Sequence, residues 1–562
     1  MLLRIISFLV IMIFSCSCSA KQVKLQEQKA LPAKDAYYLF ILGYIAEKDG
    51  KWEDAIEYYN KALEKDPGSA YIKIQISYIL LRTAKVKEAI AFAEEVVKTD
   101  PDYIPALFLL GQLYSSQKRS EESVKIYEKI LELQPDNQEA ALYLSLLYTS
   151  TQEYDKALDI LEKLLKMNPA NTMAIYYLGS INMEKGDNQK ASNYFEKVIA
   201  LRPNFDAAYF NLGLISESQN RLEEAEKYYK QVVSIDPQNL QARERLAQIY
   251  FKQKQTDKAI KQYEEIRTQA INVDVHFNLG ILYFEDKQYD KAIEEFRIVL
   301  ESKPDNVMVR YYLSLSLGEI DRTDEAISEL KKIVLQEPKN INAFLYLGFL
   351  YSKLEKDDDA ISVYEEILSF EKEKPEVYLY LASTYLHKKD YVKAEDILRD
   401  ALRRFDNNDD LNFNLAIVLE KTKRFDEMVQ YLKKAIEINP KHADALNYLG
   451  YSYAEKGIHL EEALSLIERA LDLKPDNGYI MDSLGWVYFK IGKHGQALNI
   501  LLKAIETVKD DSVVLEHIGD VYRAQGIPKK AREFWLKAME FHKKGEDEGL
   551  KERVEKKIQD LK

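Results

Sequence analysis

The chain has 562 residues, of which 46% are hydrophobic, 30% are charged and 11% are aromatic, and its formal net charge at pH 7 is −13. An acidic chain offers no electrostatic footprint for a phosphate backbone, which argues against a nucleic-acid partner. Both cysteines, Cys16 and Cys18, lie near the N-terminus, so disulfides cannot stabilise the rest of the chain and a thiol active site is excluded there.

Residues 1–20 have the pattern of a secretory signal. Arg4 gives a positive start, and residues 5–14 form an unbroken run of apolar or small side chains. The run is shorter than the roughly 20 residues that a permanent transmembrane helix needs. This favours a secretory signal over an uncleaved anchor.

The end of this segment resembles a bacterial lipoprotein signal. Residues 13–16 read Ile-Phe-Ser-Cys, with an aliphatic residue three before the cysteine, and the resemblance implies lipidation at Cys16. Because Ser17 follows, it also implies a protein anchored in the outer membrane and facing the periplasm. The alternative is cleavage after Ala20, which gives a soluble periplasmic or secreted protein. Residues 21–35 are polar and are expected to form a tether.

From residue 36 to residue 545 the sequence repeats with a period of 34 residues. Ten of the fourteen prolines keep this spacing or a multiple of it to within one residue, namely Pro67, Pro101, Pro135, Pro169, Pro203, Pro237, Pro304, Pro338, Pro440 and Pro475. A fixed period of this length indicates one helical hairpin copied end to end.

Each repeat carries further marks at fixed places. About 24 residues before the proline position stands a small residue, Ala recurs 12 before it, and Tyr often follows the small residue by three. The small residue is glycine at Gly43, Gly111, Gly179, Gly213, Gly280, Gly348, Gly450, Gly485 and Gly519. Apolar residues between these marks follow helical spacing. The small residue lets two helix backbones approach closely, and the proline ends the second helix.

This order of Leu-Gly, Tyr, Ala, an aromatic residue, Ala and Pro resembles the tetratricopeptide repeat. Fifteen units fit between Ala36 and Gly545. The resemblance predicts an all-α fold, an α-solenoid that forms a right-handed superhelix of about fifteen helical hairpins. The seventh unit, residues 240–272, departs from the pattern because it is one residue short and has Ile271 in place of the proline.

Residues 546–562 are predicted to form a C-terminal capping helix. Leu550, Val554, Ile558 and Leu561 form one apolar stripe among Lys and Glu residues. A repeat array needs such a cap because its last repeat would otherwise expose an apolar face. A helix that docks on a partner is the alternative.

The sequence carries no signature of catalysis or metal binding. It lacks HExxH, GxSxG and the phosphate-binding glycine motifs, and its seven histidines are scattered over many repeats. His517 and Asp520 stand three apart on a predicted helix, and an ordinary surface pair is the favoured interpretation. We therefore expect no enzymatic activity, no metal and no cofactor.

The resemblance places the binding surface on the first helix of each hairpin, which lines the concave side of such arrays. Two residues before the small position the chain has a recurring Tyr or Asn, and these side chains are the predicted partner-binding groove: Tyr143, Tyr177, Asn211, Asn278, Tyr312, Tyr346, Tyr380, Asn414 and Tyr448. Tyr offers a large contact area, and Asn offers both a donor and an acceptor. Packing between neighbouring first helices stays open as the alternative for the tyrosines, while the asparagines favour binding.

The sequence thus predicts a non-enzymatic protein–protein interaction scaffold of the bacterial cell envelope, reaching the membrane through its lipid anchor. Its partners would be proteins or extended peptides held in the groove, for assembly or secretion of an envelope complex. Residues 481–486 and 514–520 also resemble the end of large bacterial envelope repeat proteins. The alternative is a scaffold for polysaccharide export, in which the aromatic groove stacks on sugars.

Overall fold

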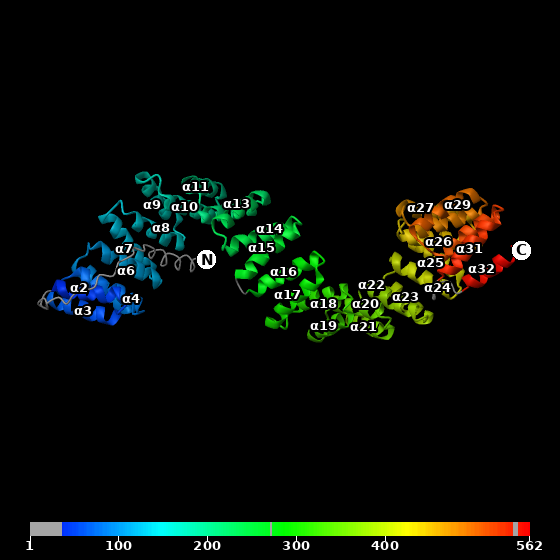
Figure 1. Ribbon diagram of the computed structural model, residues 1–562, viewed down its shortest axis with the longest axis horizontal. Coiled ribbons are helices and arrows are strands. Elements are labelled where there is room, and N and C mark those ends of the chain that lie inside the picture. The colour runs from blue at the N-terminus through cyan, green and yellow to red at the C-terminus, as the bar shows by residue number, and fades with distance from the viewer. Residues whose placement is uncertain (1–35, 270–271, 543–548, 562) are drawn as a thin grey trace, which may run out of the picture. The chain divides into compact units, whose positions relative to one another are not determined.

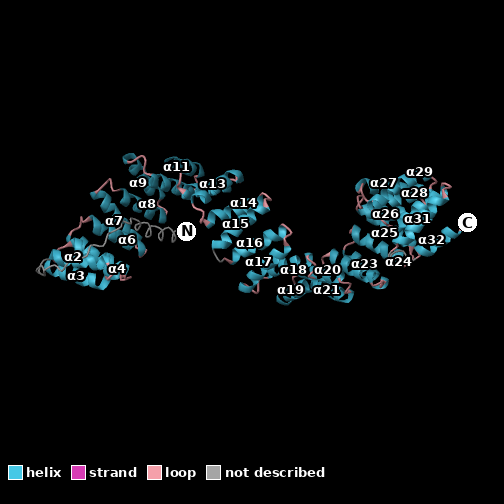
Figure 2. Ribbon diagram, viewed as in Figure 1, coloured by secondary structure: helices cyan, strands magenta, loops and turns pink. Residues whose placement is uncertain are grey.

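A computed structural model describes residues 36–269, 272–542 and 549–561 (Figure 1). The described residues form 31 helices joined by short loops, and no strand occurs among them (Figure 2). The predictions for the signal segment 1–20, the tether 21–35 and the lipidation of Cys16 lie outside the described residues.

Fifteen helix pairs follow one another along the chain. The first helices begin where the sequence period begins: α2 (Ala36–Lys48), α4 (Ala70–Arg82), α6 (Ile104–Ser116), α8 (Gln138–Ser150), α10 (Thr172–Glu184), α12 (Asp206–Ser218), α14 (Leu240–Lys252), α16 (Val273–Glu285), α18 (Val307–Glu319), α20 (Ile341–Lys353), α22 (Pro375–His387), α24 (Asp409–Lys421), α26 (Ala443–Lys456), α28 (Gly478–Lys490) and α30 (Ser512–Ala524).

The second helices are α3 (Trp52–Lys65), α5 (Val86–Thr99), α7 (Ser120–Leu133), α9 (Tyr154–Met167), α11 (Asn188–Leu201), α13 (Leu222–Ile235), α15 (Thr256–Gln269), α17 (Tyr289–Ser302), α19 (Thr323–Gln336), α21 (Asp357–Phe370), α23 (Tyr391–Arg404), α25 (Phe425–Ile438), α27 (Leu460–Leu473), α29 (His494–Thr507) and α31 (Pro528–Phe541), and α32 (Leu550–Gln559) follows them. The predicted all-α solenoid of about fifteen hairpins is confirmed.

Polar residues at the end of one repeat start the first helix of the next. Asn137 Oδ1 accepts a hydrogen bond from the backbone N–H of Ala140 at 3.1 Å, and Asn340 does the same for Ala343 at 3.0 Å. Such caps pair one of the N–H groups that a helix leaves free at its start. Pro135, just before Asn137, has no N–H to donate and ends the preceding helix.

The two helices of a hairpin meet at the recurring glycine. A methyl group on Gly348 of α20 would lie 2.5 Å from the Tyr364 ring of α21, and one on Gly213 of α12 would lie 2.6 Å from the Tyr229 ring of α13. Only a residue without a side chain leaves room for an aromatic ring at that place. The rings fill the core in return, and Tyr229 is fully buried.

A hydrogen bond from the recurring tyrosine joins several successive repeats. The hydroxyl of Tyr148 in α8 donates to Glu128 of the preceding α7 at 2.5 Å, and Tyr283 in α16 donates to Glu264 of α15 at 2.7 Å. Each bond ties a first helix to the second helix of the repeat before it. The tyrosine therefore contributes to the stacking of hairpins as well as to their apolar core.

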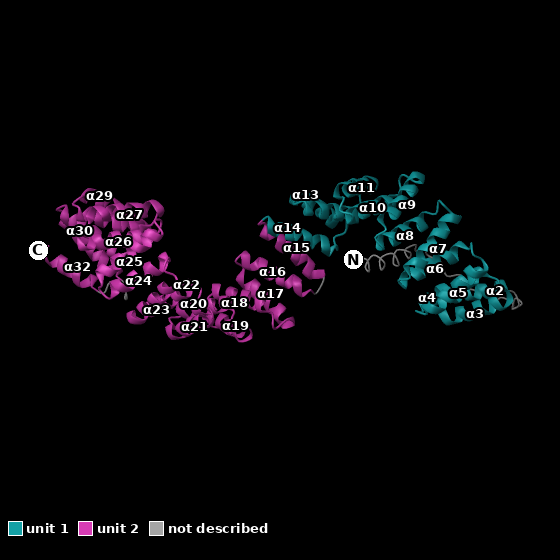
Figure 3. Cartoon of the chain, turned by 180° about the vertical axis from the view of Figure 1, so that it is seen from behind, with its two compact units in different colours: residues 1–253 teal, residues 254–562 magenta. Residues whose placement is uncertain are grey.

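The chain divides into two compact units, residues 1–253 and 254–562 (Figure 3). The division falls between α14 and α15, within the seventh repeat, whose sequence departs from the pattern. The features described below as a hollow and as a C-terminal cluster both lie within the second unit.

The last helix, α32, packs on the fifteenth hairpin. Leu550 and Val554 are fully buried and belong to one apolar cluster with Trp535 of α31, while Ile558 and Leu561 pack against that cluster. The apolar stripe therefore covers the end of the second unit, which is the contact that a capping helix makes.

Candidate binding surface on the first helices

The nine predicted groove residues all lie on first helices, from α8 to α26. Eight of them are half-buried, and Tyr380 of α22 is the exception, with 49% of its surface exposed. Their surroundings differ from repeat to repeat, so the contacts of each side chain decide between packing and binding.

Two of the tyrosines pack against the preceding repeat. Tyr143 stacks on Tyr127 of α7 with ring centroids 5.4 Å apart, and Tyr312 stacks on Phe296 of α17 at 6.0 Å. Both partners are buried rings of a second helix. At these two places the packing alternative describes the contacts, because each tyrosine extends the apolar core between successive hairpins.

Hydrogen bonds within the chain engage three other members. The hydroxyl of Tyr448 donates to Glu420 Oε2 at 2.9 Å, and Asn211 Nδ2 donates to the Tyr176 hydroxyl at 3.3 Å. Asn414 Nδ2 donates at 2.9 Å to a backbone carbonyl one turn earlier in its own helix. Tyr448 and Asn211 therefore connect successive first helices, whereas Asn414 is bonded within its own helix.

Tyr346 and Tyr380 are brought together in a hollow of about 420 Å³. Three successive first helices, α18, α20 and α22, form it together with α21. Its lining consists of Tyr311, Asn342, Leu345, Tyr346, Phe349, Ser352, Tyr364, Tyr380, Ser383 and Thr384. We call this feature the aromatic hollow.

Two stacked pairs of rings contribute to the aromatic hollow. The Tyr346 and Phe349 rings lie 6.0 Å apart with their planes at 13°, and Tyr380 stacks on Tyr364 at 5.8 Å. One ring of each pair faces solvent, since Phe349 is 56% exposed and Tyr380 is 49% exposed. Covering two such rings with a partner removes apolar area from water, which stabilises a complex.

Gly318 of α18 leaves the space that Tyr346 occupies. A methyl group on Gly318 would collide with the Tyr346 hydroxyl, which lies against the backbone of the preceding first helix. Gly318 stands outside the recurring small position, so the repeat pattern does not single it out. Phe349 is also not among the nine predicted residues, but it directly follows Gly348, at a position where apolar or aromatic residues recur and would line the groove if they faced inward.

The aromatic hollow is neutral. None of its ten lining side chains is acidic or basic. Burial, with a smaller contribution from the Glu319 carboxylate, raises the pKa of Tyr346 to about 12. Burial also raises the pKa of Tyr364. Both hydroxyls therefore keep their protons at neutral pH and remain able to donate hydrogen bonds.

The C-terminal repeats bury a histidine at the position that Tyr380 occupies in its own repeat. His517 of α30 is 5% exposed, its Nδ1 lies 2.8 Å from Asp482 Oδ1 of α28, and its ring stacks on Trp486 at 4.1 Å. The prediction of an ordinary surface pair with Asp520 is therefore wrong. Residues about one period apart lie side by side on successive first helices, which is why Asp482 reaches the ring.

Glu516, next to His517, holds the capping helix. It is 3% exposed, Arg553 Nη2 donates to its Oε2 at 2.8 Å, and Lys557 Nζ donates to its Oε1 at 2.7 Å. Lys557 also donates to Asp520 Oδ2 at 2.6 Å. Burial acts to raise the pKa of Glu516, but the two cations outweigh it and the pKa is lowered. We call these groups, with His517, Asp482 and Trp486, the C-terminal cluster.

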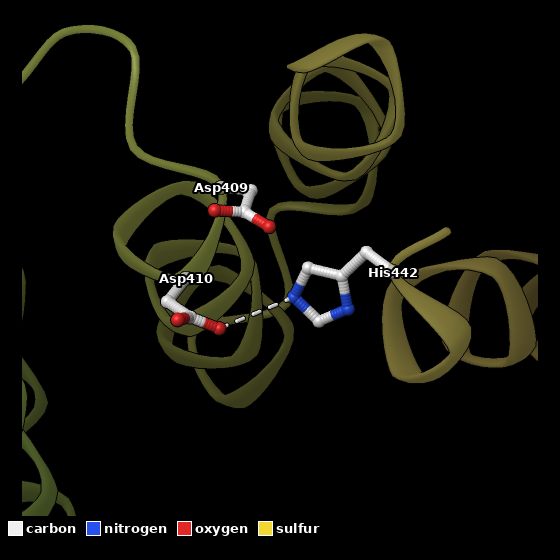
Figure 4. A group of neighbouring side chains, drawn as sticks. All are labelled: Asp409, Asp410 and His442. Atoms are coloured by element: carbon white, nitrogen blue, oxygen red, sulfur yellow. Dashed lines mark ion pairs between the residues drawn. The ribbon is translucent and has the colours of Figure 1, made fainter. Parts of the chain in front are cut away.

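One group in the described part of the chain has the spacing of a metal site, Asp409 and Asp410 of α24 with His442 before α26 (Figure 4). His442 Nδ1 accepts a hydrogen bond from the backbone N–H of Ala445 at 3.2 Å. The neutral ring therefore carries its proton on Nε2, which faces Asp410 Oδ1 at 3.4 Å. A nitrogen that carries a proton cannot bind a metal ion, so this group is a helix cap backed by a carboxylate.

Comparison with known families identifies the repeat. Residues 41–260 match the family described as "Tetratricopeptide repeat protein 21 N-terminal ARM repeat", residues 282–408 match "Psidin, N-terminal TPR repeats region", and residues 244–307 and 385–449 match families described as "Tetratricopeptide repeat". The chain is a tetratricopeptide-repeat protein. No curated protein matches its sequence.

Solved structures similar to this tetratricopeptide-repeat protein include the APC/C hetero-tetramer Cut9–Hcn1, with 16% identity, coverage of 82% of this chain and 98% of that chain, and a TM-score of 0.38. The yeast Tom70 has 15% identity, coverage of 93% and 99%, and a TM-score of 0.36. YrrB, described as a TPR protein with an unusual peptide-binding site, has 22% identity, coverage of 34% and 97%, and a TM-score of 0.29.

Among the described residues of this tetratricopeptide-repeat protein, no helix combines the length and the apolar character that crossing a bilayer requires.

Proposed function

We propose that this tetratricopeptide-repeat protein is a non-enzymatic scaffold that binds extended segments of other proteins on the surface of its first helices. The observation that carries the proposal is the aromatic hollow, whose neutral lining includes two half-exposed rings from successive repeats, Phe349 and Tyr380. Aromatic residues are enriched in the cores of protein interfaces, and tyrosine loses little conformational entropy when it is covered.

The surrounding hairpins support this proposal because they hold the rings in place before a partner arrives. Phe349 rests on Tyr346, and Tyr380 rests on Tyr364, whose own ring lies against Gly348. A surface whose side chains are already ordered avoids part of the entropy cost of binding.

We further propose that the scaffold works in the bacterial cell envelope, anchored in the outer membrane by lipid on Cys16 and facing the periplasm. The N-terminal sequence supports this proposal, and the net charge of −13 favours basic or neutral partners. Labelling with a radioactive fatty acid in a bacterial host tests the anchor. Cys16→Ala is expected to abolish labelling that the native chain shows, and equal labelling of the two would reject it.

Site-specific photo-crosslinking tests the scaffold proposal. A photo-reactive amino acid in place of Tyr380 is expected to give adducts with other proteins in intact cells. The matched control is the same amino acid in place of Leu335, which is 84% exposed on the second helix α19 of the same unit. Equal protein adducts at both positions would contradict the proposal, and so would adducts with glycan alone.

A further inference from the structure

The aromatic hollow is unusual in its chemistry. It has five rings in its lining and no charged side chain, in a chain of which 30% of residues are charged. A carboxylate placed against these rings would lose hydration and find no cationic partner in the lining. A segment that enters the aromatic hollow therefore carries no acidic side chain along the part that lies there.

The polar groups of the aromatic hollow can donate hydrogen bonds as well as accept them. Asn342 and Ser383 are exposed at its surface, and an amide N–H₂ and a hydroxyl are both donors. The hydroxyls of Tyr346 and Tyr380 add further donors. A segment that presents unused carbonyl groups therefore finds donors for them in the lining.

Proline-rich chains have this property among peptide segments. Proline lacks a backbone N–H, so a run of prolines presents carbonyl acceptors without the matching donors. In the polyproline II conformation none of these carbonyls is used internally, and the chain is already extended and ordered before it binds. Aromatic-lined grooves dock such segments because proline rings pack flat on aromatic faces.

An ordinary extended peptide fits the aromatic hollow less well, because it must be ordered when it binds, a cost that a chain already in the polyproline II conformation largely avoids. A sugar could stack on the same rings and use the same hydroxyl and amide groups, and the oligosaccharide probe below distinguishes it from a proline-rich segment.

We infer that the aromatic hollow binds a proline-rich segment of a partner protein, free of acidic residues, in the polyproline II conformation. This inference rests on the proposed scaffold function and names the class of segment that the scaffold holds. Phe349 and Tyr380 stack on the proline rings, and Asn342 and the tyrosine hydroxyls donate to the carbonyls.

Fluorescence anisotropy with synthetic peptides and the purified full-length chain tests the inference. The probes are a short labelled peptide of Pro and Ala, a Gly/Ser peptide of the same length, the same Pro/Ala peptide with Glu residues inserted, and a labelled cello-oligosaccharide. The Pro/Ala peptide is expected to bind at least about tenfold more tightly than the other three.

Variants then locate the binding. Tyr380→Ala is expected to weaken the Pro/Ala peptide by about tenfold or more, and Tyr380→Phe by a few-fold because only the donor is lost. Gly318→Ala displaces the Tyr346 hydroxyl and is expected to weaken binding as well. The matched control is Tyr479→Ala, which removes a 61% exposed tyrosine from the first helix α28 of the same unit and is expected to change nothing. Thermal unfolding checks that each variant is folded.

The outcomes separate this inference from the scaffold proposal. If the Gly/Ser or the Glu-containing peptide binds as tightly and Tyr380→Ala still weakens it, the ligand class is wrong while the scaffold proposal stands. The ligand class is likewise wrong if no peptide binds although position 380 crosslinks to proteins in cells. Preference for the oligosaccharide, or equal loss in the Tyr479→Ala variant, also overturns the inference.

Discussion

The aromatic hollow and the C-terminal cluster use the same helical positions in opposite ways. One residue after the small position stands Phe349, 56% exposed, in the hollow and Trp486, 7% exposed, in the cluster. Two residues before it stand Tyr380, 49% exposed, and His517, 5% exposed. A ring at these positions therefore becomes an open surface only where its neighbours leave it uncovered.

Polar partners make the difference at the C-terminus. Trp486 Nε1 donates to Glu455 Oε2 at 2.8 Å, and the ring lies on His517, which Asp482 engages. Phe349 has no polar atom that could be engaged in this way. At the C-terminus, stacked rings together with charged groups on the adjacent repeats therefore close the surface that stays open at the aromatic hollow.

The largest expected effect comes from overfilling the hairpin beneath the aromatic hollow. Gly348→Leu should lower the free energy of unfolding by roughly 1–3 kcal/mol, because its first side-chain carbon alone would lie 2.5 Å from the Tyr364 ring. The displaced ring also supports Tyr380, so peptide binding should weaken. Chemical denaturation and the anisotropy assay measure the two effects.

Gly495 of α29 is the matched control for this change. It is also a helical glycine, but nothing lies within 4 Å of a methyl group placed on it. Gly495→Leu should therefore leave stability unchanged or raise it slightly, since leucine is a better helix former than glycine. A neutral Gly348→Leu variant would show that the helix register assigned to this repeat is wrong.

The next largest effect concerns the docking of α32 by the C-terminal cluster. Glu516→Ala removes the buried acceptor of Arg553 and Lys557 and should destabilise the docking of α32 by about 1–2 kcal/mol, because both cations are partly exposed and regain water. Faster amide hydrogen exchange in α32 measures this opening. Glu533→Ala, which removes a solvent-exposed pair with Lys537, should change exchange much less.

The C-terminal cluster should also respond to pH in a way that the aromatic hollow does not. Burial acts to lower the pKa of His517, but Asp482, with Asp520 and Glu516, outweighs it and the pKa is raised above its usual 6.5. Protonation therefore stabilises the folded cluster. That contribution is complete below pH 6.5 and is lost as the pH rises through the raised pKa.

Hydrogen exchange of α30, corrected for the intrinsic pH dependence of exchange, measures this effect. Protection should fall as the pH is raised above about 6.5, and Asp482→Asn should flatten the dependence. Peptide binding to the aromatic hollow should stay constant over the same window, because the lining contains no carboxylate, histidine or amine and burial raises the pKa of Tyr346 to about 12. A cluster whose protection rises with pH would reverse the assigned sign.

Much of the fold could be predicted because the residues that begin and end each helical hairpin recur at fixed positions in the sequence. Pro135 and Asn137 mark the end of one hairpin and the start of the next, and Gly348 marks the close approach of two helices. These are local signals that recur at a fixed period, so a single sequence suffices to place them. They fix which face of each first helix is buried, and with it the positions of Tyr346 and Tyr380.

The site was harder to predict because its character depends on neighbouring repeats. Tyr312 and Tyr380 stand at equivalent positions and stack on equivalent rings, Phe296 and Tyr364, yet Phe284 also packs on Tyr312 while Tyr380 stays 49% exposed. Helical spacing pairs His517 with Asp520 three residues away, whereas its partner is Asp482, 35 residues away. Comparing residues one period apart, rather than one helical turn apart, was the signal that could have found this contact.

The smallest expected effect concerns the hydrogen bonds that tie a first helix to the second helix of the preceding repeat. The hydroxyl of Tyr385 in α22 donates to Glu365 of α21 at 3.1 Å, and that of Tyr488 in α28 donates to Glu468 of α27 at 3.4 Å. Tyr385→Phe should lower the free energy of unfolding by about 0.5–1 kcal/mol, and Tyr488→Phe by less because its bond is longer. Chemical denaturation of the two variants in parallel measures the difference.

The peptide affinity of the Tyr385→Phe variant shows whether this hydrogen bond between repeats also affects the aromatic hollow. Tyr385 is buried at the contact between α21 and α22 but is not part of the lining of the aromatic hollow. If the rings are held mainly by their stacking on Tyr346 and Tyr364, the loss of one hydrogen bond between the repeats leaves the affinity for the Pro/Ala peptide unchanged. A several-fold loss would instead mean that the angle between the two hairpins sets the shape of the aromatic hollow, and that the contacts between repeats, not only the rings, determine what this surface accepts.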